Sequence, residues 1–255
     1  MSKSSSPGFW TLAPERVDLG ENEVHVWSIL MDDAGLCFEC YWDLLSLEEG
    51  ERASRFKFEI DRRRYVFAHG VLRSILASYL NLPPADLQFF LGSNGKPRLA
   101  LGTAGERLEF NLSHSHAMSL VAVTRGREIG VDVEHVREDF AFDQVAGRFF
   151  TSQEVVALRA LPGRLQRHAF YKCWTSKEAF LKGKGTGLSG ELDEVEIILT
   201  AEEIVKIRSA IRNWSLVELS PCEGYVGALA LEGPECQVKC FQWRQLTNKS
   251  IHPHA

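Results

Sequence analysis

Three carboxylates in two segments of this sequence have the type and spacing needed for chemistry. The first two lie in Gly130–Glu134, where apolar residues alternate with others, as in a strand with one buried face. Asp132 and Glu134 would leave the same face of that strand, about 6.6 Å apart along the backbone. A third carboxylate nearby would complete a small set of oxygen ligands.

That third carboxylate is Glu178, about forty residues further along, in the segment Ala169–Lys182. The segment contains neither Gly nor Pro, and Phe170, Trp174, Glu178 and Lys182 recur every four residues, which predicts a helix. One face of this helix presents a carboxylate one turn before an ammonium. Because Mg²⁺ prefers few carboxylates, several waters and phosphate oxygens, the two segments indicate metal-assisted chemistry on a phosphate or pyrophosphate.

The elements that must position these residues form two halves of similar make-up, 9–126 and 127–247, between loose tails at 1–8 and 248–255. A capping box at Ser46 and Glu49 opens helical sequence that runs towards Leu80. The other expected elements are strands near 24–30, 87–91, 108–112, 118–124, 129–134, 194–199, 214–219, 225–231 and 237–243, and helices near 142–160 and 164–183. We therefore expect an α+β protein of two pseudo-duplicated halves, with the site in the seam between them.

An ordered set of short motifs resembles the Sfp-type 4'-phosphopantetheinyl transferases. The motifs follow one another from about Arg52 to Ser189, and each is weak when taken alone. They are Gly95-Lys96-Pro97, Phe110-Asn111-Leu112-Ser113-His114-Ser115, Gly130-Val131-Asp132-Val133-Glu134, Arg148-Phe149-Phe150 with Glu154, and Trp174-Thr175-Ser176-Lys177-Glu178-Ala179-Phe180-Leu181-Lys182 followed by Gly185, Gly187, Leu188 and Ser189.

The resemblance implies the transferase fold and a Mg²⁺-dependent reaction. The 4'-phosphopantetheine group of coenzyme A would pass to a serine of an apo acyl, peptidyl or aryl carrier protein. Asp132, Glu134 and Glu178 match the family's metal ligands, and Mn²⁺ is expected to substitute for Mg²⁺. Catalytic roles are implied for Glu178, Glu154 and Lys182. The positions that match contacts to coenzyme A are Arg52, Arg64, Lys96, Ser113, His114 and Lys182.

Several of these residues also have a simpler interpretation. Lys182 could form an ordinary i, i+4 pair with Glu178, worth about 0.2–0.5 kcal/mol. Glu154 matches a residue suggested in the family as the base for the acceptor hydroxyl. Thr151–Glu154 is also a capping box, and we favour this structural role for Glu154. Glu178 or a metal-bound water would then take the proton. The basic run that ends at Arg64 could be a solvated helix face. A metal site made of His114 and His116 lacks further ligands of suitable type.

The cysteines are expected to be reduced and partly buried. Cys37 and Cys40 form a C-x-x-C, but no paired histidines accompany them, and on a strand they would point to opposite faces. A zinc site is therefore the less favoured alternative. An even count of six cysteines does not by itself predict disulfides in a chain of 255 residues.

Composition limits the alternatives. A net charge of −5 disfavours a general nucleic-acid binder, and with it the rival interpretation as a metal-dependent nuclease. A non-catalytic carrier-binding module is disfavoured because every acidic motif position is filled. The sequence contains no signal peptide and no run of 18 apolar residues, so we expect a cytoplasmic protein without a membrane segment. We also expect a monomer.

Overall fold

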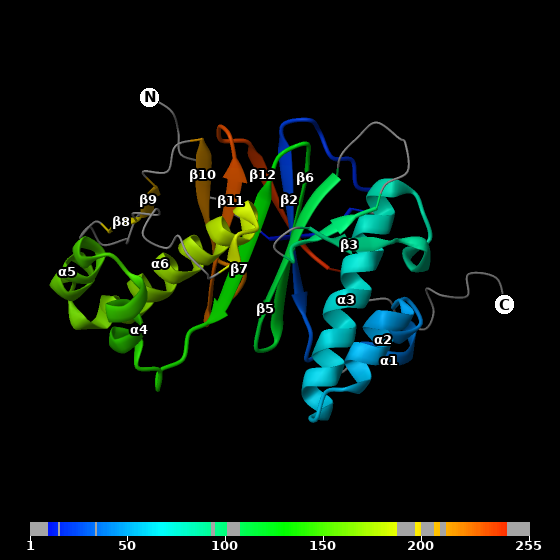
Figure 1. Ribbon diagram of the computed structural model, residues 1–255, viewed down its shortest axis with the longest axis horizontal. Helices are drawn as coiled ribbons and strands as arrows, with labels where there is room; N and C mark the ends of the chain where they lie inside the picture. Colours follow the sequence, from blue (N-terminus) through cyan, green and yellow to red (C-terminus); the bar gives the residue numbers. More distant parts are fainter. Residues whose placement is uncertain are drawn as a thin grey trace.

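Two β-sheets pack face to face, and each carries helices on its outer face (Figure 1). The computed structural model describes residues 10–14, 16–33, 35–92, 95–100, 108–187, 197–199, 207–209 and 213–243. The expected tails, residues 194–196 of one expected strand, and Leu188 and Ser189 of the last motif lie outside this described part. The architecture is α+β, as the sequence predicts.

The larger sheet has the strand order β1-β12-β2-β6-β5. Strand β12 runs parallel to its neighbours β1 and β2, and the remaining pairs are antiparallel. The strands are β1 (Thr11–Leu12), β2 (Glu23–Leu30), β5 (Leu108–Ser115), β6 (Met118–Arg125) and β12 (Gln237–Gln242). Helices α1 (Phe38–Trp42), α2 (Leu47–Ser54) and α3 (Glu59–Leu80) bury their apolar faces against it.

The smaller sheet is antiparallel, with the order β10-β11-β7. Its strands are β7 (Ile129–His135), β10 (Trp214–Leu219) and β11 (Tyr225–Glu232). Its helices are α4 (Phe142–Phe149), α5 (Ser152–Ala160) and α6 (Gly163–Lys184). The remaining elements are a short 3-10 helix, Pro84–Asp86, and two small hairpins, β3 (Phe89–Leu91) with β4 (Pro97–Leu99) and β8 (Ile197–Leu199) with β9 (Ile207–Ser209).

Strand periodicity decides which residues face which layer. In β7, Val131 and Val133 are fully buried against the larger sheet, so Asp132, which lies between them, must face α6. Figure 1 shows α6 crossing the smaller sheet on the side opposite the larger one. The alternation predicted at Gly130–Glu134 therefore aims the acidic residues at the helix that carries Glu178.

The structure corrects several element boundaries. The helical sequence from Glu48 to Leu80 is two helices, α2 and α3, and the expected helix at 142–160 is likewise divided into α4 and α5. Helix α1 and strand β1 had no predicted counterpart. Strand β12, assigned by sequence to the second half, pairs with β2 in the sheet of the first half. Its alternating pattern identifies a strand but does not say which sheet edge the strand joins.

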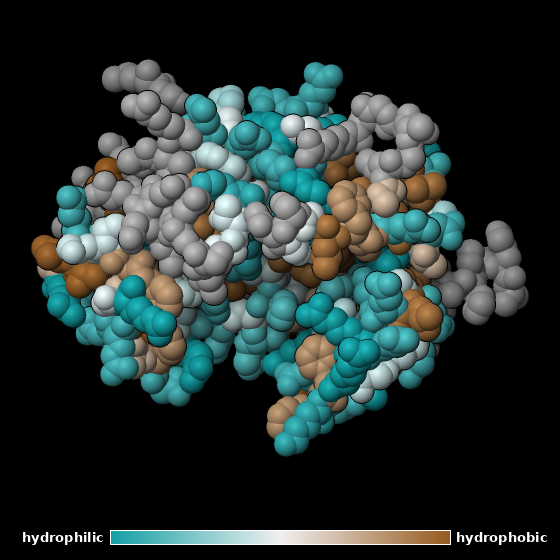
Figure 2. All heavy atoms as spheres, in the orientation of Figure 1, coloured by the Kyte–Doolittle hydropathy of each residue, from teal (hydrophilic) through white to brown (hydrophobic). Residues whose placement is uncertain are grey.

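The molecular surface is largely hydrophilic on the face seen in Figure 2, with hydrophobic residues in separate groups. Within the described residues, no helix has the length and apolar character required to cross a membrane. Large apolar side chains that are more than half exposed include Leu47, Phe58, Leu91 and Val156.

Candidate functional site

The site is built where α6 crosses β7 at very short range, and two glycines make this crossing possible. A Cβ atom on Gly130 would lie 1.9 Å from the carbonyl oxygen of Ala179, and one on Gly183 would lie 2.6 Å from the Trp214 ring. A side chain at Gly130 would push the helix off the strand, and one at Gly183 would collide with the Trp214 ring. The close crossing places Glu178 and Lys182 over the acidic face of β7.

Asp132 and Lys182 form the centre of the site. The Lys182 ammonium donates to Oδ1 of Asp132 at 2.7 Å and to the Ser113 hydroxyl at 2.8 Å. Ser113 donates to the same Asp132 oxygen at 2.9 Å. Asp132 is only 3% exposed, and burial raises its pKa although the Lys182 charge opposes the rise. The structure therefore brings together three predicted site residues, one from each of β5, β7 and α6.

Glu134 and Glu178 belong to the same charge cluster. Burial, followed by the charge of Asp132, raises the pKa of Glu178 to about 7. Burial also raises the pKa of Glu134, although a hydrogen bond from Ser115, 2.7 Å long, acts in the opposite direction. Three carboxyl groups thus lie around one ammonium, and burial makes their ionised forms costly unless a further cation is present.

The donor chemistry of this cluster suits a hard divalent cation. Oδ2 of Asp132 and Oε1 of Glu178 are buried oxygens without a hydrogen-bond partner, although buried polar atoms are normally paired. As the side chains stand, no His, Cys, Asp or Glu residues of the described part form a group of three close enough to hold a metal ion. Shared ligation by Asp132, Glu134 and Glu178 would require side-chain rotation, so the chemistry fits Mg²⁺ although the present rotamers do not enclose an ion.

The seam between the two sheets is held by side chains of β5 rather than by a backbone ladder. Asn111 accepts from the amide of Val131, Ser113 from that of Val133, and Ser115 from that of His135, at 2.9–3.3 Å. Sequence reasoning assigned Ser113 to coenzyme binding and missed this role. The available signal was the polar residue at every second position of an otherwise apolar strand. The Ser113 hydroxyl uses its one donor and both acceptor sites within the protein.

A cavity of about 370 Å³ opens beside the carboxylates. Ser115 and Glu134 line one end of it, and α4, α6 and the residues after β7 contribute mainly aromatic and apolar side chains. These are Phe140, Val145, Phe170, Tyr171 and Trp174, together with the polar residues His116, His135 and Arg137. His116, considered above as a metal ligand with His114, instead stacks on His135 with ring centroids 5.0 Å apart.

Cationic and aromatic side chains of α2 and α3 lie in a row. The Arg52 guanidinium lies 5.7 Å from the centre of the Tyr65 ring, and Tyr65 stacks on His69 at 4.1 Å. Partial desolvation and then the charges of Lys182 and His69 lower the pKa of His114. Arg52, Tyr65 and His69 therefore form a row of contacts, and His114, which like Arg52 is predicted to contact the coenzyme, is influenced by the charges of His69 and Lys182.

Arg64 and Lys96 are engaged elsewhere. Arg64 forms a bidentate pair with Asp32, with distances of 2.9 Å and 2.5 Å. The buried Lys96 ammonium donates to Glu128, to the carbonyl of Ile129 and to the carbonyl of Gly183 at 2.9–3.0 Å. All three of its donors are used, and they tie the β3–β4 hairpin to β7 and to the end of α6.

Glu154 is 1% exposed and has three protein partners. Its carboxylate accepts from the amides of Thr151 and Ile197, each at 2.8 Å, and pairs with the fully buried Lys177 at 2.9 Å. The capping box of Thr151 and Glu154 is confirmed. A carboxylate enclosed in this way is poorly placed to accept a proton from an incoming hydroxyl.

Comparison with known proteins gives a consistent family assignment. The model of the 4'-phosphopantetheinyl transferase superfamily matches residues 128–230, and that of the 4'-phosphopantetheinyl transferase N-terminal region matches residues 34–125. The 4'-phosphopantetheinyl transferase HetI of Nostoc sp. is 39% identical over 234 residues, which cover 92% of this chain and 98% of that protein. The 4'-phosphopantetheinyl transferase Sfp of Bacillus subtilis is 31% identical over 170 residues, or 66% of this chain and 73% of that one. The chain belongs to the 4'-phosphopantetheinyl transferase superfamily.

Proposed function

We propose that this protein transfers the 4'-phosphopantetheine group of coenzyme A to a serine of an apo acyl, peptidyl or aryl carrier protein. The products are the holo-carrier and adenosine 3',5'-bisphosphate. The observation that carries this proposal is the cluster of Asp132, Glu178 and Lys182, with two unpaired buried carboxylate oxygens. It is a site for a cation next to an ammonium, as a pyrophosphate requires.

We assign the surroundings of the cluster to parts of coenzyme A by their chemistry. We assign the surface from Arg52 to His114 to the 3'-phosphate and the adenosine side, and Lys182 and His114 to the pyrophosphate. The cavity that begins at Glu134 takes the pantetheine arm, because its lining is largely aromatic and apolar. With a cation held by the carboxylates, the Lys182 ammonium would contact phosphate oxygens in place of Asp132.

In the reaction, the serine oxygen attacks the phosphorus that carries the pantetheine arm. The bond from that phosphorus to the bridging oxygen breaks, and its electron pair leaves with adenosine 3',5'-bisphosphate. Mg²⁺ held by Asp132, Glu134 and Glu178 would neutralise charge on the bridging oxygen. Lys182 and His114 hold the phosphate oxygens, and the Glu178 carboxylate accepts the serine proton. Glu154 has no part in this step.

The test incubates the purified protein with coenzyme A and a panel of apo-carriers, with Mg²⁺, with Mn²⁺ or with a chelator, and reads the carrier mass. We expect one added phosphopantetheine with either metal and none with the chelator. Asp132→Asn and Glu178→Gln should fold but lose orders of magnitude in rate. Asp143→Asn, on the exposed face of α4, is the matched control and should keep wild-type turnover. Near-wild-type turnover in either of the first two variants would refute the metal assignment.

A further inference from the structure

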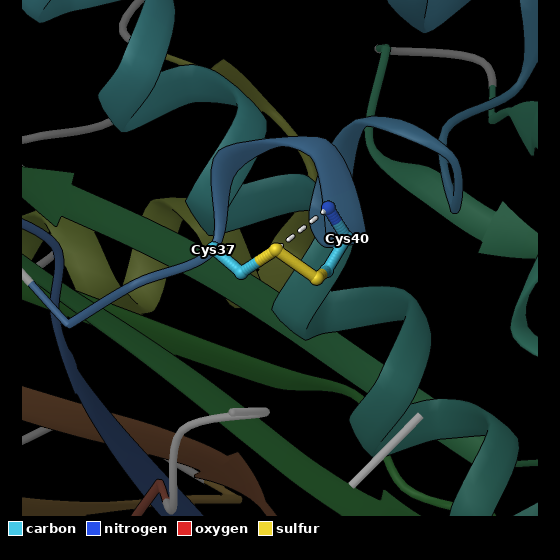
Figure 3. Close-up of a disulfide and its surroundings, with 2 residues drawn as sticks. All are labelled: Cys37 and Cys40. Carbon is cyan, nitrogen blue, oxygen red and sulfur yellow. Dashed lines mark hydrogen bonds between the residues drawn. A yellow bond between two sulfur atoms is a disulfide. The ribbon is translucent and has the colours of Figure 1, made fainter. Parts of the chain in front are cut away.

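The first turn of α1 is closed by a disulfide between Cys37 and Cys40 (Figure 3). This corrects the sequence-based expectation of reduced thiols. Cys37 is the N-cap of α1, and its sulfur also accepts from the Cys40 amide at 3.3 Å. Because the chain turns into a helix here rather than continuing as a strand, the two side chains face each other instead of opposite sides. Both residues are partly exposed.

The disulfide is not what holds α1 in place. It spans a sequence separation of 3, and short loops constrain the unfolded chain least. The helix is held by Tyr41, which is fully buried, packs edge-on against Phe67 at 5.7 Å and would contact any side chain placed at Gly70. Reduction of the disulfide would leave these contacts intact, so a purely structural role does not explain it.

The surroundings of the pair favour exchange chemistry. Cys37 and Cys40 have the C-x-x-C spacing of exchange sites, and both are partly exposed, so a thiolate from outside can reach the pair. The other four cysteines are not disulfide-bonded, and burial raises the pKa of each of their thiols.

We propose that Cys37–Cys40 is a reversible thiol–disulfide exchange site whose reaction partner is a dithiol with its two thiols close together. A thiolate of the partner attacks one sulfur of the pair, the bond between Cys37 and Cys40 breaks, and a mixed disulfide forms. The partner's second thiol then displaces the protein thiol. The protein gains two electrons and two protons as two free thiols, and the partner becomes a cyclic disulfide. This site is independent of the proposed transferase reaction.

The experiment equilibrates the folded full-length protein in buffers that contain reduced and oxidised dithiothreitol in graded ratios. Acid quenching, maleimide labelling and peptide mass analysis then report each cysteine separately. We expect Cys37 and Cys40 to change together from unlabelled to fully labelled in one two-electron transition. Circular dichroism and the melting curve should show a folded protein throughout. Cys37→Ser and Cys40→Ser should remove the transition, whereas Cys222→Ser, at an exposed unpaired cysteine, should retain it.

Two results would overturn the proposal. Complete labelling of both cysteines in the most oxidising buffer would mean that the folded protein forms no disulfide here. A pair that resists reduction until the chain is denatured would be a structural disulfide. Both results are measured on the wild-type protein, so the test does not depend on the folding of a variant.

Discussion

The buried ion pair of Glu154 and Lys177 makes it possible to test whether Glu154 is a structural residue or the general base. If Glu154 were only a cap, Glu154→Gln would preserve the acceptor for the Thr151 amide, and even loss of the cap would cost about 1 kcal/mol. The structure predicts a larger effect, because Gln leaves the fully buried Lys177 ammonium without its carboxylate. Breaking a buried pair by removing one partner costs about 3–5 kcal/mol. The buried pair therefore outweighs the cap.

We expect Glu154→Gln to lower the melting temperature by roughly 10 °C, from about 2–4 °C per kcal/mol for a protein of this size. The double variant Glu154→Gln/Lys177→Met removes both charges and should recover most of that loss, since an apolar replacement of a buried pair is often close to neutral. Urea unfolding and thermal melting of the wild type, Glu154→Gln, Lys177→Met and the double variant complete the cycle.

Turnover measured well below the melting temperature separates the two roles. As a structural residue, Glu154 should leave kcat near wild type in the stable double variant. If Glu154 is the general base, kcat of that same folded variant should fall roughly 10²–10⁴-fold. A large kcat loss in a double variant of near-wild-type stability would refute our reasoning and transfer the proton-accepting role from Glu178 to Glu154.

We make three further predictions, for the arginine that we assign to coenzyme A, for the cavity and for the partly buried carboxylate of Glu49. Arg52→Ala should raise KM for coenzyme A and weaken the enzyme's preference for coenzyme A over its 3'-dephosphorylated form. Arg64→Ala should keep that preference, because the Arg64 side chain is paired with Asp32. Steady-state kinetics with both substrates measures the preference, and the same preference in both variants would contradict the assignment. Val145→Trp, which fills the cavity, should raise KM for coenzyme A but leave inhibition by adenosine 3',5'-bisphosphate unchanged; a parallel change in both would place the arm elsewhere. Burial raises the pKa of Glu49, but hydrogen bonds from His69, Ser46 and Arg73 outweigh it and lower that pKa to about 2. The ionised Glu49 should therefore stabilise the folded protein by about 3 kcal/mol above pH 4.5, and this stabilisation should be lost between pH 4.5 and 2. Urea unfolding of Glu49→Gln and wild type should therefore converge near pH 2, and a constant difference at every pH would show that the charge of Glu49 is not responsible.

Local patterns in the sequence predicted what depends on neighbours along the chain. Both capping boxes are present, at Ser46 and at Thr151. The alternation around Asp132 and the four-residue period through Glu178 correctly assigned a strand and a helix, because side-chain direction in each is fixed by backbone geometry. These two segments alone predict where the candidate site lies.

Partners that come from distant parts of the chain could not be predicted. Lys96 and Lys177 have the charge of ordinary surface residues, yet both are buried by elements that are remote in sequence. Nothing local distinguishes a lysine that contacts phosphate from one whose three donors are used by carbonyls and carboxylates. The sequence predicts the wrong geometry for Cys37 and Cys40, because a strand would point their side chains apart, whereas the segment is a helical turn that brings them together.

The buried pair of Glu154 and Lys177 also explains how one face of α6 can be positioned for catalysis. Lys177 and Glu178 are neighbours, so they point to different sides of the helix. Lys177 is fixed by Glu154 on the side of α5, and Gly183 rests against Gly130 of β7. Two fixed points on opposite sides set both the rotation and the height of the helix over the strand. Glu178 is therefore aimed at Asp132 by residues that never touch the substrate.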